Sequence, residues 1–390
     1  MKNNWIEKSY FLGSILFFLP FQLHYVFFSM FVAIFFVKLS LDENKKVNKS
    51  VFFLSLLLLL FSIPGYLQSQ IDSNEIITKF FIFILTLNAI IYMTRDYTTN
   101  DSVRVISKVT FVIVLLNFLQ CLYSVVELNM WSEPFKSEKN SISAYLIEQS
   151  TILIGSPNKN IWASKLFMFC LPFFSLIYDR RVKFTSVFTV SLLLMFGFVM
   201  IYTQSRTTQG LLLLVCCFWL FSYIYKSKSI LLKVFVILCM FFISFKTYPI
   251  VINKFLYFEL DYGDGFFSRI LLWIVALPNV FNNILFGFGF GSGHWLIEGT
   301  TQLDAKNFHN VFLNTVMDLG LISALALIIL LFRGLTIVMS RSCLSRGAFL
   351  VIFIPVFLIF SVQYVGYDPE YLFIIFTLSL MKKDDSYYEH

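Results

Sequence analysis

Long apolar segments alternate with short polar ones along most of the chain. A helix needs about 20 apolar residues to cross a bilayer, so each such segment predicts a transmembrane helix. We therefore predict an all-α integral membrane protein with about twelve transmembrane helices, near residues 9–22, 24–40, 51–67, 76–94, 105–126, 161–178, 184–203, 208–225, 230–250, 310–332, 348–364 and 368–381. The first two segments are short, and the pattern leaves open whether 9–40 is one span or two.

The basic residues between these segments predict how the chain is oriented. They gather in every second connection, near residues 2–8, 38–49, 95–108, 180–183, 226–233, 333–346 and 382–383. The short alternate connections near 21–23, 68–75 and 364–369 contain no Lys or Arg. Because Lys and Arg mark the cytoplasmic side of membrane proteins, we expect both termini to lie in the cytoplasm.

Two connections on the opposite side are much longer than the others. They cover roughly 127–160 and 251–309, and their content of polar residues and glycine rises sharply. We predict a single polytopic membrane domain, 1–390, with these two segments as periplasmic loops. The larger loop is expected to contain short amphipathic helices.

Composition excludes a soluble domain. Hydrophobic residues make up 58% of the chain and charged residues 14%, and the mean hydropathy is +0.77, so the surface must face lipid. The net charge of +7 comes from basic residues scattered between apolar spans, and we expect no nucleic-acid partner. The cysteines have no metal-ligand spacing and none falls in a loop assigned to the outside, so we expect neither a disulfide nor a metal site.

Arg206 is the first candidate functional residue. It lies between two apolar spans, in the segment 202–208, at the outer boundary of the membrane. A guanidinium there is costly unless an anion meets it, and its planar donor fork fits phosphate oxygens. A topological arginine that extends to lipid headgroups fits the pattern equally well.

Arg269 and His309 are candidates in and beside the larger loop. Arg269 is expected on an amphipathic helix along the outer surface, where it could also anchor the interface together with Trp273. His309 precedes an apolar run, where an imidazole can accept a proton from a sugar hydroxyl or serve a structural role. The two arginines and the histidine converge on one membrane face, which suits an enzyme acting on an anionic lipid headgroup. A transporter would more often carry ionisable groups near mid-membrane and broken helices in paired halves.

Four carboxylates of the larger loop could coordinate a divalent ion, but their irregular spacing favours solvated loop charges. They are Asp261, Asp264, Glu298 and Asp304.

Three motifs resemble those of the O-antigen ligase and polymerase family of integral-membrane glycosyltransferases. They are the run Tyr-Thr-Gln-Ser-Arg-Thr-Thr-Gln-Gly at 202–210; Ser268-Arg269-x-x-x-Trp273 followed by Asn282-Asn283 and by Gly287, Gly289 and Gly291; and His309-Asn310-x9-Gly320-x-x-Ser323. Ser323 stands where the family usually has glycine, which puts the local helix packing in doubt more than the chemistry. The segment Ser156-Pro157-Asn158 is similar to a further family element. The resemblance covers roughly 150–330.

The resemblance implies a GT-C-like membrane fold and a set of site residues. Arg206 and Arg269 would bind the diphosphate of an undecaprenyl-diphosphate-linked oligosaccharide, with support from Gln204 and Gly289. His309, supported by Asn310, would orient or deprotonate the attacking sugar hydroxyl. The family reaction inverts the anomeric centre, and no cofactor or metal is expected.

Polymerase activity is the function that we expect, at the periplasmic face of a bacterial inner membrane. The compact 251–309 loop and its Ser-Arg-x-x-x-Trp opening favour it. A ligase that transfers finished O-antigen to lipid A-core is the alternative, and a flippase for lipid-linked sugars is a third. The partners would be membrane lipids and the lipid-linked oligosaccharide, and a polysaccharide chain-length regulator is a candidate partner of a polymerase.

Overall fold

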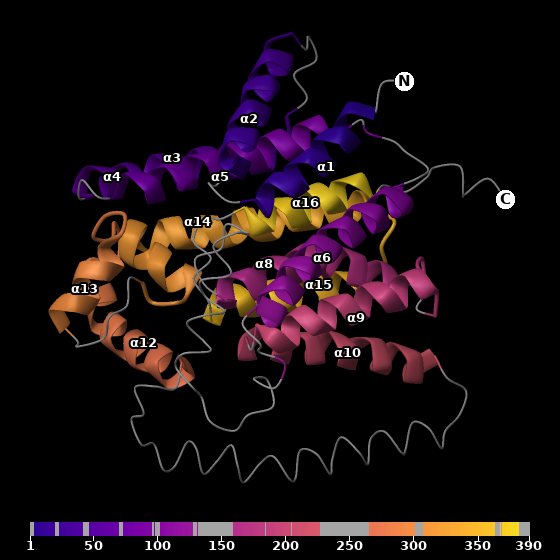
Figure 1. Ribbon diagram of the computed structural model, residues 1–390. Coiled ribbons are helices and arrows are strands. Elements are labelled where there is room, and N and C mark those ends of the chain that lie inside the picture. The colour runs from indigo at the N-terminus through magenta and orange to yellow at the C-terminus, as the bar shows by residue number, and fades with distance from the viewer. Residues whose placement is uncertain are drawn as a thin grey trace.

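The computed structural model describes residues 4–19, 23–41, 47–69, 73–95, 97, 102–127, 131, 159–183, 185–203, 205–226, 265–300, 307–362, 367 and 369–381. In these ranges the elements are helices: α1 (Asn4–Phe17), α2 (Leu23–Leu41), α3 (Lys49–Phe61), α4 (Ile63–Gln68), α5 (Asn74–Met93), α6 (Ser102–Glu127), α8 (Lys159–Tyr178), α9 (Val187–Tyr202), α10 (Arg206–Lys226), α12 (Gly265–Asn282), α13 (Ser292–Thr300), α14 (Val311–Arg341), α15 (Arg346–Val362) and α16 (Glu370–Leu380). Figure 1 shows them as one bundle.

Within the described ranges, seven helical segments are long and apolar enough to cross a membrane. They are Leu23–Leu41, Lys49–Gln68, Asn74–Met93, Ser102–Glu127, Asn160–Tyr178, Arg206–Ile224 and Val311–Arg341. Shorter apolar helices accompany them at Val187–Tyr202, Arg269–Asn282, Arg346–Val362 and Glu370–Leu380. The prediction of an all-α integral membrane protein is therefore confirmed. The expected span 230–250 lies outside the described residues.

The segment 9–40 forms two helices, α1 and α2. α1 ends at Phe17 and α2 begins at Leu23. They pack closely where Gly13 meets the ring of Phe27, because a Cβ at Gly13 would lie 2.6 Å from Phe27 Cε1. Small residues permit such close approaches between membrane helices, which lack a strong hydrophobic drive to associate within lipid.

Helix α8 lies at the centre of the bundle. It contacts α6, α10, α15 and α16. In its apolar stretch within Asn160–Tyr178, 89% of the residues are buried. Inside this apolar environment the indole Nε1 of Trp162 donates to Asn117 Oδ1 of α6 at 2.6 Å. Interhelical hydrogen bonds of this kind hold membrane helices together, because an unpaired polar group in hydrocarbon is costly.

The helices α1 and α16 run antiparallel, which defines the two ends of the bundle. Tyr10 lies beside Thr377, with 2.9 Å between the hydroxyl oxygens, and the ring of Phe17 packs on Phe373 with centroids 4.6 Å apart. The beginning of α1 and the end of α16 therefore share one end, which we call the terminal end.

The opposite end, which we call the α12 end, carries α12 and α13 (Figure 1). The start of α14 meets the end of α15 there, because Asn310 Nδ2 donates to the Ser361 carbonyl at 2.9 Å. The start of α5 joins them through Ser73, whose hydroxyl donates to the Phe290 carbonyl at 2.6 Å.

Exposed basic residues gather where α8, α14 and α15 meet at the terminal end. The link between α8 and α15 is a contact of Asp179 with Ser345, whose backbone N–H donates to Asp179 Oδ2 at 2.6 Å. The exposed residues around it are Arg180, Arg181, Lys183, Arg341 and Arg346.

Candidate functional site at the α12 end

Arg269 and Trp273 lie one turn apart on α12, so their side chains share a face of the helix. The indole Nε1 of Trp273 donates to the backbone carbonyl of Phe308 at 2.8 Å. Leu272 and Ala276 pack in a small apolar cluster with Phe308. The Ser-Arg-x-x-x-Trp motif thus fixes α12 against the segment immediately before His309.

His309 is half-buried in the loop that leads into α14. Its backbone is left-handed, with φ of 50°, and its N–H donates to Asn307 Oδ1 at 2.9 Å. Burial and the nearby positive charge of Arg269 lower the pKa of the imidazole to about 4. Arg269 and His309 are 40 residues apart in sequence, but the bond from Trp273 to Phe308 brings the helix that carries Arg269 against the residue before His309. At neutral pH the imidazole is uncharged and can accept a proton.

Arg269 itself is partly withdrawn from water. Burial lowers the pKa of its guanidinium, because desolvation disfavours the charged form. A bound anion would offset this cost of burial.

Asn310 and Asn314 hold the beginning of α14. Asn310 is the N-cap, and its Oδ1 accepts from the Leu313 N–H at 2.9 Å. Asn314, one turn later, is buried; its Nδ2 donates to the Asn310 carbonyl at 2.7 Å, and its Oδ1 accepts from the Phe308 N–H at 3.3 Å. The expected supporting residue Asn310 therefore organises the helix start directly below His309.

α14 is broken at Gly320, and the loop that follows α12 crosses it there. Gly320 has φ of 83° and ψ of 171°, far from helical values. The loop bonds to both sides of the break, since the Phe288 N–H donates to Met317 O at 2.7 Å and the Leu321 N–H donates to Ile284 O at 2.7 Å. The helix break therefore docks the α12–α13 region against α14.

Gly287 and Gly289 permit this crossing. A Cβ at Gly287 would lie 2.6 Å from the Asp318 carbonyl carbon, and one at Gly289 would lie 2.8 Å from the Gln68 carbonyl carbon. Both residues also have positive φ, of 71° and 100°. The glycines thus have a packing role, because they let their backbone approach other backbone closely.

Asp318 was not anticipated from the sequence. It is buried, and its Oδ1 accepts from the backbone N–H of Ser292 at 3.2 Å and from the Ser292 hydroxyl at 3.1 Å. Ser292 is the first residue of α13, so Asp318 accepts from a donor at that helix start, and the same N–H also donates to the Gly289 carbonyl at 3.1 Å. The sequence signal was an acidic residue in an apolar run, two residues before a glycine.

Arg206 is the first residue of α10 and is exposed. α9 begins after α8 at the terminal end, crosses the bundle, and is followed within a few residues by α10, so Arg206 lies at the α12 end. It thus shares an end of the bundle with Arg269 and His309. The expected supporting residue Gln204 lies outside the described residues.

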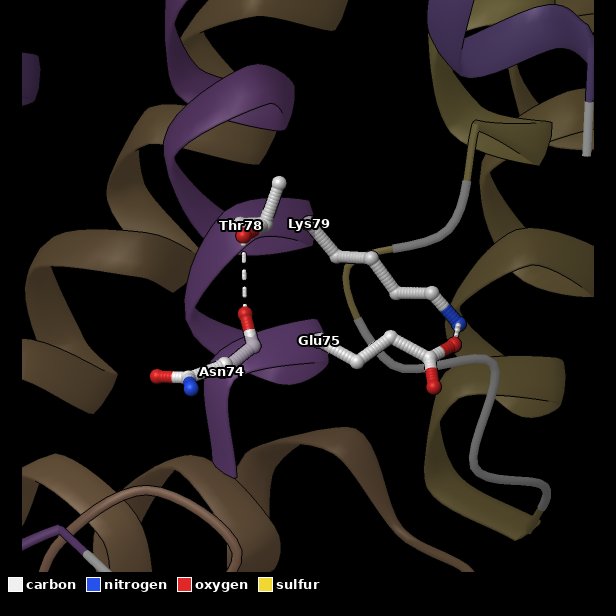
Figure 2. Close-up of polar contacts among 4 residues, drawn as sticks. All are labelled: Asn74, Glu75, Thr78 and Lys79. Atoms are coloured by element: carbon white, nitrogen blue, oxygen red, sulfur yellow. Dashed lines mark hydrogen bonds and ion pairs between the residues drawn. The ribbon is translucent and has the colours of Figure 1, made fainter. Parts of the chain in front are cut away.

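Lys79 is a further cation at the α12 end, and it is already paired. Its Nζ lies 2.9 Å from Glu75 Oε1 in the first turns of α5, beside the bond from the Thr78 hydroxyl to the Asn74 carbonyl (Figure 2). Glu75 therefore offsets its charge.

The structure describes only some of the remaining candidates from the sequence. Asp261, Asp264, Asp304 and the segment Ser156-Pro157-Asn158 lie outside the described residues, and Glu298 falls within α13. His294 is exposed on α13. Across the part of the chain that the structure describes, no three His, Cys, Asp or Glu residues are grouped as a metal site.

Part of the chain matches a known protein family. Residues 188–328 match a family model described as O-antigen ligase, and the matched segment runs from α9 into the second half of α14. It includes Arg206, Arg269 and His309. No curated protein matched the chain. Residues 188–328 of the chain are thus similar to the O-antigen ligase family, which supports the resemblance seen in the sequence motifs.

Proposed function

We propose that the protein is an O-antigen repeat-unit polymerase. It would transfer glycan from undecaprenyl diphosphate to a sugar hydroxyl of a second lipid-linked repeat unit. The family match supports ligase-type or polymerase-type glycosyl transfer. The observation that carries the proposal is the bond from Trp273 to Phe308 at the α12 end, because it sets the helix that carries the Arg269 guanidinium against the residue before His309, a proton acceptor.

In this reaction the acceptor hydroxyl oxygen attacks the anomeric carbon while the bond from that carbon to the diphosphate oxygen breaks. His309 takes the hydroxyl proton, and the electron pair of the broken bond leaves with undecaprenyl diphosphate. Attack opposite the leaving group inverts the anomeric centre. Arg269 and Arg206 stabilise the charge that grows on the diphosphate, where electrostatic stabilisation is most effective. With two guanidinium groups in that role, the proposed reaction needs no metal.

The pKa of His309 connects donor binding to catalysis in this proposal. In the free protein the charge of Arg269 helps to hold that pKa at about 4. A diphosphate bound to Arg269 would offset the charge and raise the pKa of the imidazole, which makes it a stronger base. The base would therefore be most effective once the donor is in place.

The charge distribution supports an active site on the periplasmic side of the inner membrane. The exposed basic cluster near Asp179 and Ser345 lies at the terminal end, and basic residues favour the cytoplasm. The α12 end, opposite to it, would then face the periplasm, where lipid-linked repeat units are joined. A polysaccharide chain-length regulator is a proposed partner on that side.

Ligation of finished O-antigen to lipid A-core is the second candidate, favoured by the description of the matched family model. It uses the same donor chemistry and so the same three residues. A flippase would use the cations for binding but would not need a proton acceptor.

A deletion strain tests these alternatives by the banding pattern of its lipopolysaccharide. Core carrying a single repeat unit would identify a polymerase, whereas bare core with accumulated lipid-linked polymer would identify a ligase. The strain is complemented with wild type, with His309→Ala, and with His294→Ala as a control at an exposed histidine. We expect His294→Ala to restore the ladder and His309→Ala to fail. An unchanged ladder in the deletion strain would contradict both candidates, and restoration by His309→Ala would favour a flippase.

A further inference from the structure

Two side chains fix the backbone of Phe308 from two helices. Asn314 of α14 accepts from its N–H at 3.3 Å, and Trp273 of α12 donates to its carbonyl at 2.8 Å. The side chain of Phe308 is itself fully buried. The N–H and the carbonyl of Phe308, the residue before His309, are therefore both hydrogen-bonded to side chains.

Asn314 also holds the other neighbour of His309. Its Nδ2 donates to the Asn310 carbonyl at 2.7 Å, so one amide side chain bonds the residues on both sides of the histidine. His309 lies between them with φ of 50°, a conformation that residues other than glycine rarely adopt. Such a conformation persists where the surroundings determine it strongly.

We propose that Asn314 is a positioning residue that acts through Phe308 and Asn310 to hold the His309 imidazole beside Arg269. The inference rests on the proposed function, in which His309 takes the proton. Among the described neighbours of His309, Arg269 is the charged group that acts on it, whereas Asn307, Asn310 and Asn314 are uncharged.

Asn117 offers a closely matched control. It is also buried, its Nδ2 donates to the carbonyl four residues earlier (Ile113, 2.8 Å), and its Oδ1 accepts from a Trp162 indole at 2.6 Å. It lies between α6 and α8, away from His309. Asn117→Leu therefore removes a comparable set of hydrogen bonds without touching the site.

The experiment compares Asn314→Leu with Asn117→Leu in the full-length protein, reconstituted in lipid nanodiscs with a lipid-linked repeat unit. For Asn314→Leu we expect kcat per folded protein to fall about 100-fold, because a small misplacement of a reacting group has that effect. The KM for the donor should change little, since Arg206 and Arg269 are untouched. In the pH profile of kcat/KM, the fall in activity on the acidic side should also shift. Its midpoint should move up from about pH 4 towards 6.5, the ordinary pKa of histidine, as His309 loses its burial. Asn117→Leu should change neither quantity.

Equal losses of kcat in the two variants, or an acidic limb that stays in place, would overturn the positioning role. Should Asn314→Leu fail to fold, Trp273→Phe removes one donor to Phe308 while it keeps an aromatic ring, and the same two shifts are expected from it. His309→Ala is measured in parallel. If it is inactive while the positioning variants are fully active, this inference fails and the proposed function stands. If His309→Ala is itself fully active, the proposed role of the histidine fails.

Discussion

Replacing Gly320 with alanine should destabilise the protein strongly. The added Cβ would lie 2.0 Å from Leu285 O, 2.3 Å from Leu285 C and 2.6 Å from Phe286 N, all of them backbone atoms. The backbone of Gly320, with φ of 83° and ψ of 171°, is also one that glycine alone adopts readily. A side chain in such a region costs about 1–3 kcal/mol.

The clash can be relieved by moving the crossing loop away from α14. That movement breaks three backbone hydrogen bonds, from Phe288 N to Met317 O, from Gly289 N to Asp318 O and from Leu321 N to Ile284 O. At about 1 kcal/mol each, their loss adds about 3 kcal/mol. The sum, about 4–6 kcal/mol, is comparable with the whole stability of many proteins, about 5–15 kcal/mol.

Thermal denaturation of the purified protein in detergent, together with its abundance in membranes, measures the effect. Gly197→Ala is the control, because a Cβ at Gly197 of α9 meets nothing within 4 Å. Alanine there should leave the stability unchanged or raise it by up to about 1 kcal/mol. If Gly320→Ala and Gly197→Ala denatured at the same temperature, the contact between Gly320 and the loop after α12 would not limit stability, and this prediction would be wrong.

Three further predictions concern the site and its support. Arg269→Gln should raise the pKa of His309 from about 4, so the acidic limb of kcat/KM should move to higher pH in a pH–rate profile; an unmoved limb would contradict the proposed pairing. Arg206→Lys keeps the charge but loses the donor fork, so the KM for the lipid-linked donor should rise about tenfold in steady-state kinetics with an unchanged melting temperature. Ser323→Gly removes the hydrogen bond from the Ser323 hydroxyl to Phe61 O (3.3 Å) and should lower the free energy of unfolding by about 1–2 kcal/mol with activity retained, as measured by denaturation and turnover.

The arrangement of helices was largely predictable from the sequence because lipid imposes one strong rule. Each apolar run of sufficient length must satisfy its backbone hydrogen bonds internally, so it forms a helix. The predicted segments within the described ranges correspond to helices, and the question left open at 9–40 is answered by the two helices α1 and α2. Their contacts were not predictable, since the packing of Gly13 against Phe27 depends on which faces meet.

Ser323 shows how a departure from a family pattern can have a local cause. The sequence suggested that the packing of this helix differs where serine replaces the usual glycine. In the structure Ser323 is fully buried and its hydroxyl donates to Phe61 O of α3. The serine therefore fits at this contact and adds a hydrogen bond between two helices, a bond that a motif comparison does not reveal.

The candidate site residues stand out in the sequence, whereas the residues that hold them in place do not. His309 stands out because the chain has only four histidines, and Arg269 because it lies in a segment predicted to run along the outer surface of the membrane. Asn314 and Asp318 gave no comparable signal, since each is a single polar residue inside the run that forms α14. Their roles depend on partners far away in sequence, as when Asp318 binds Ser292 of α13.

The break at Gly320 lets the irregular loop after α12 form hydrogen bonds with α14. A continuous α14 would offer no free carbonyls, whereas the break presents those of Met317 and Asp318 to the loop after α12. The same loop begins α13 at Ser292, which Asp318 holds. α12 is thereby fixed at its end by the crossing and along its length by the bond from Trp273 to Phe308. Because Arg269 lies on that helix and His309 follows Phe308, the distance between them is set by α14 on one side and α12 on the other. Loosening either attachment should therefore impair the same chemical step.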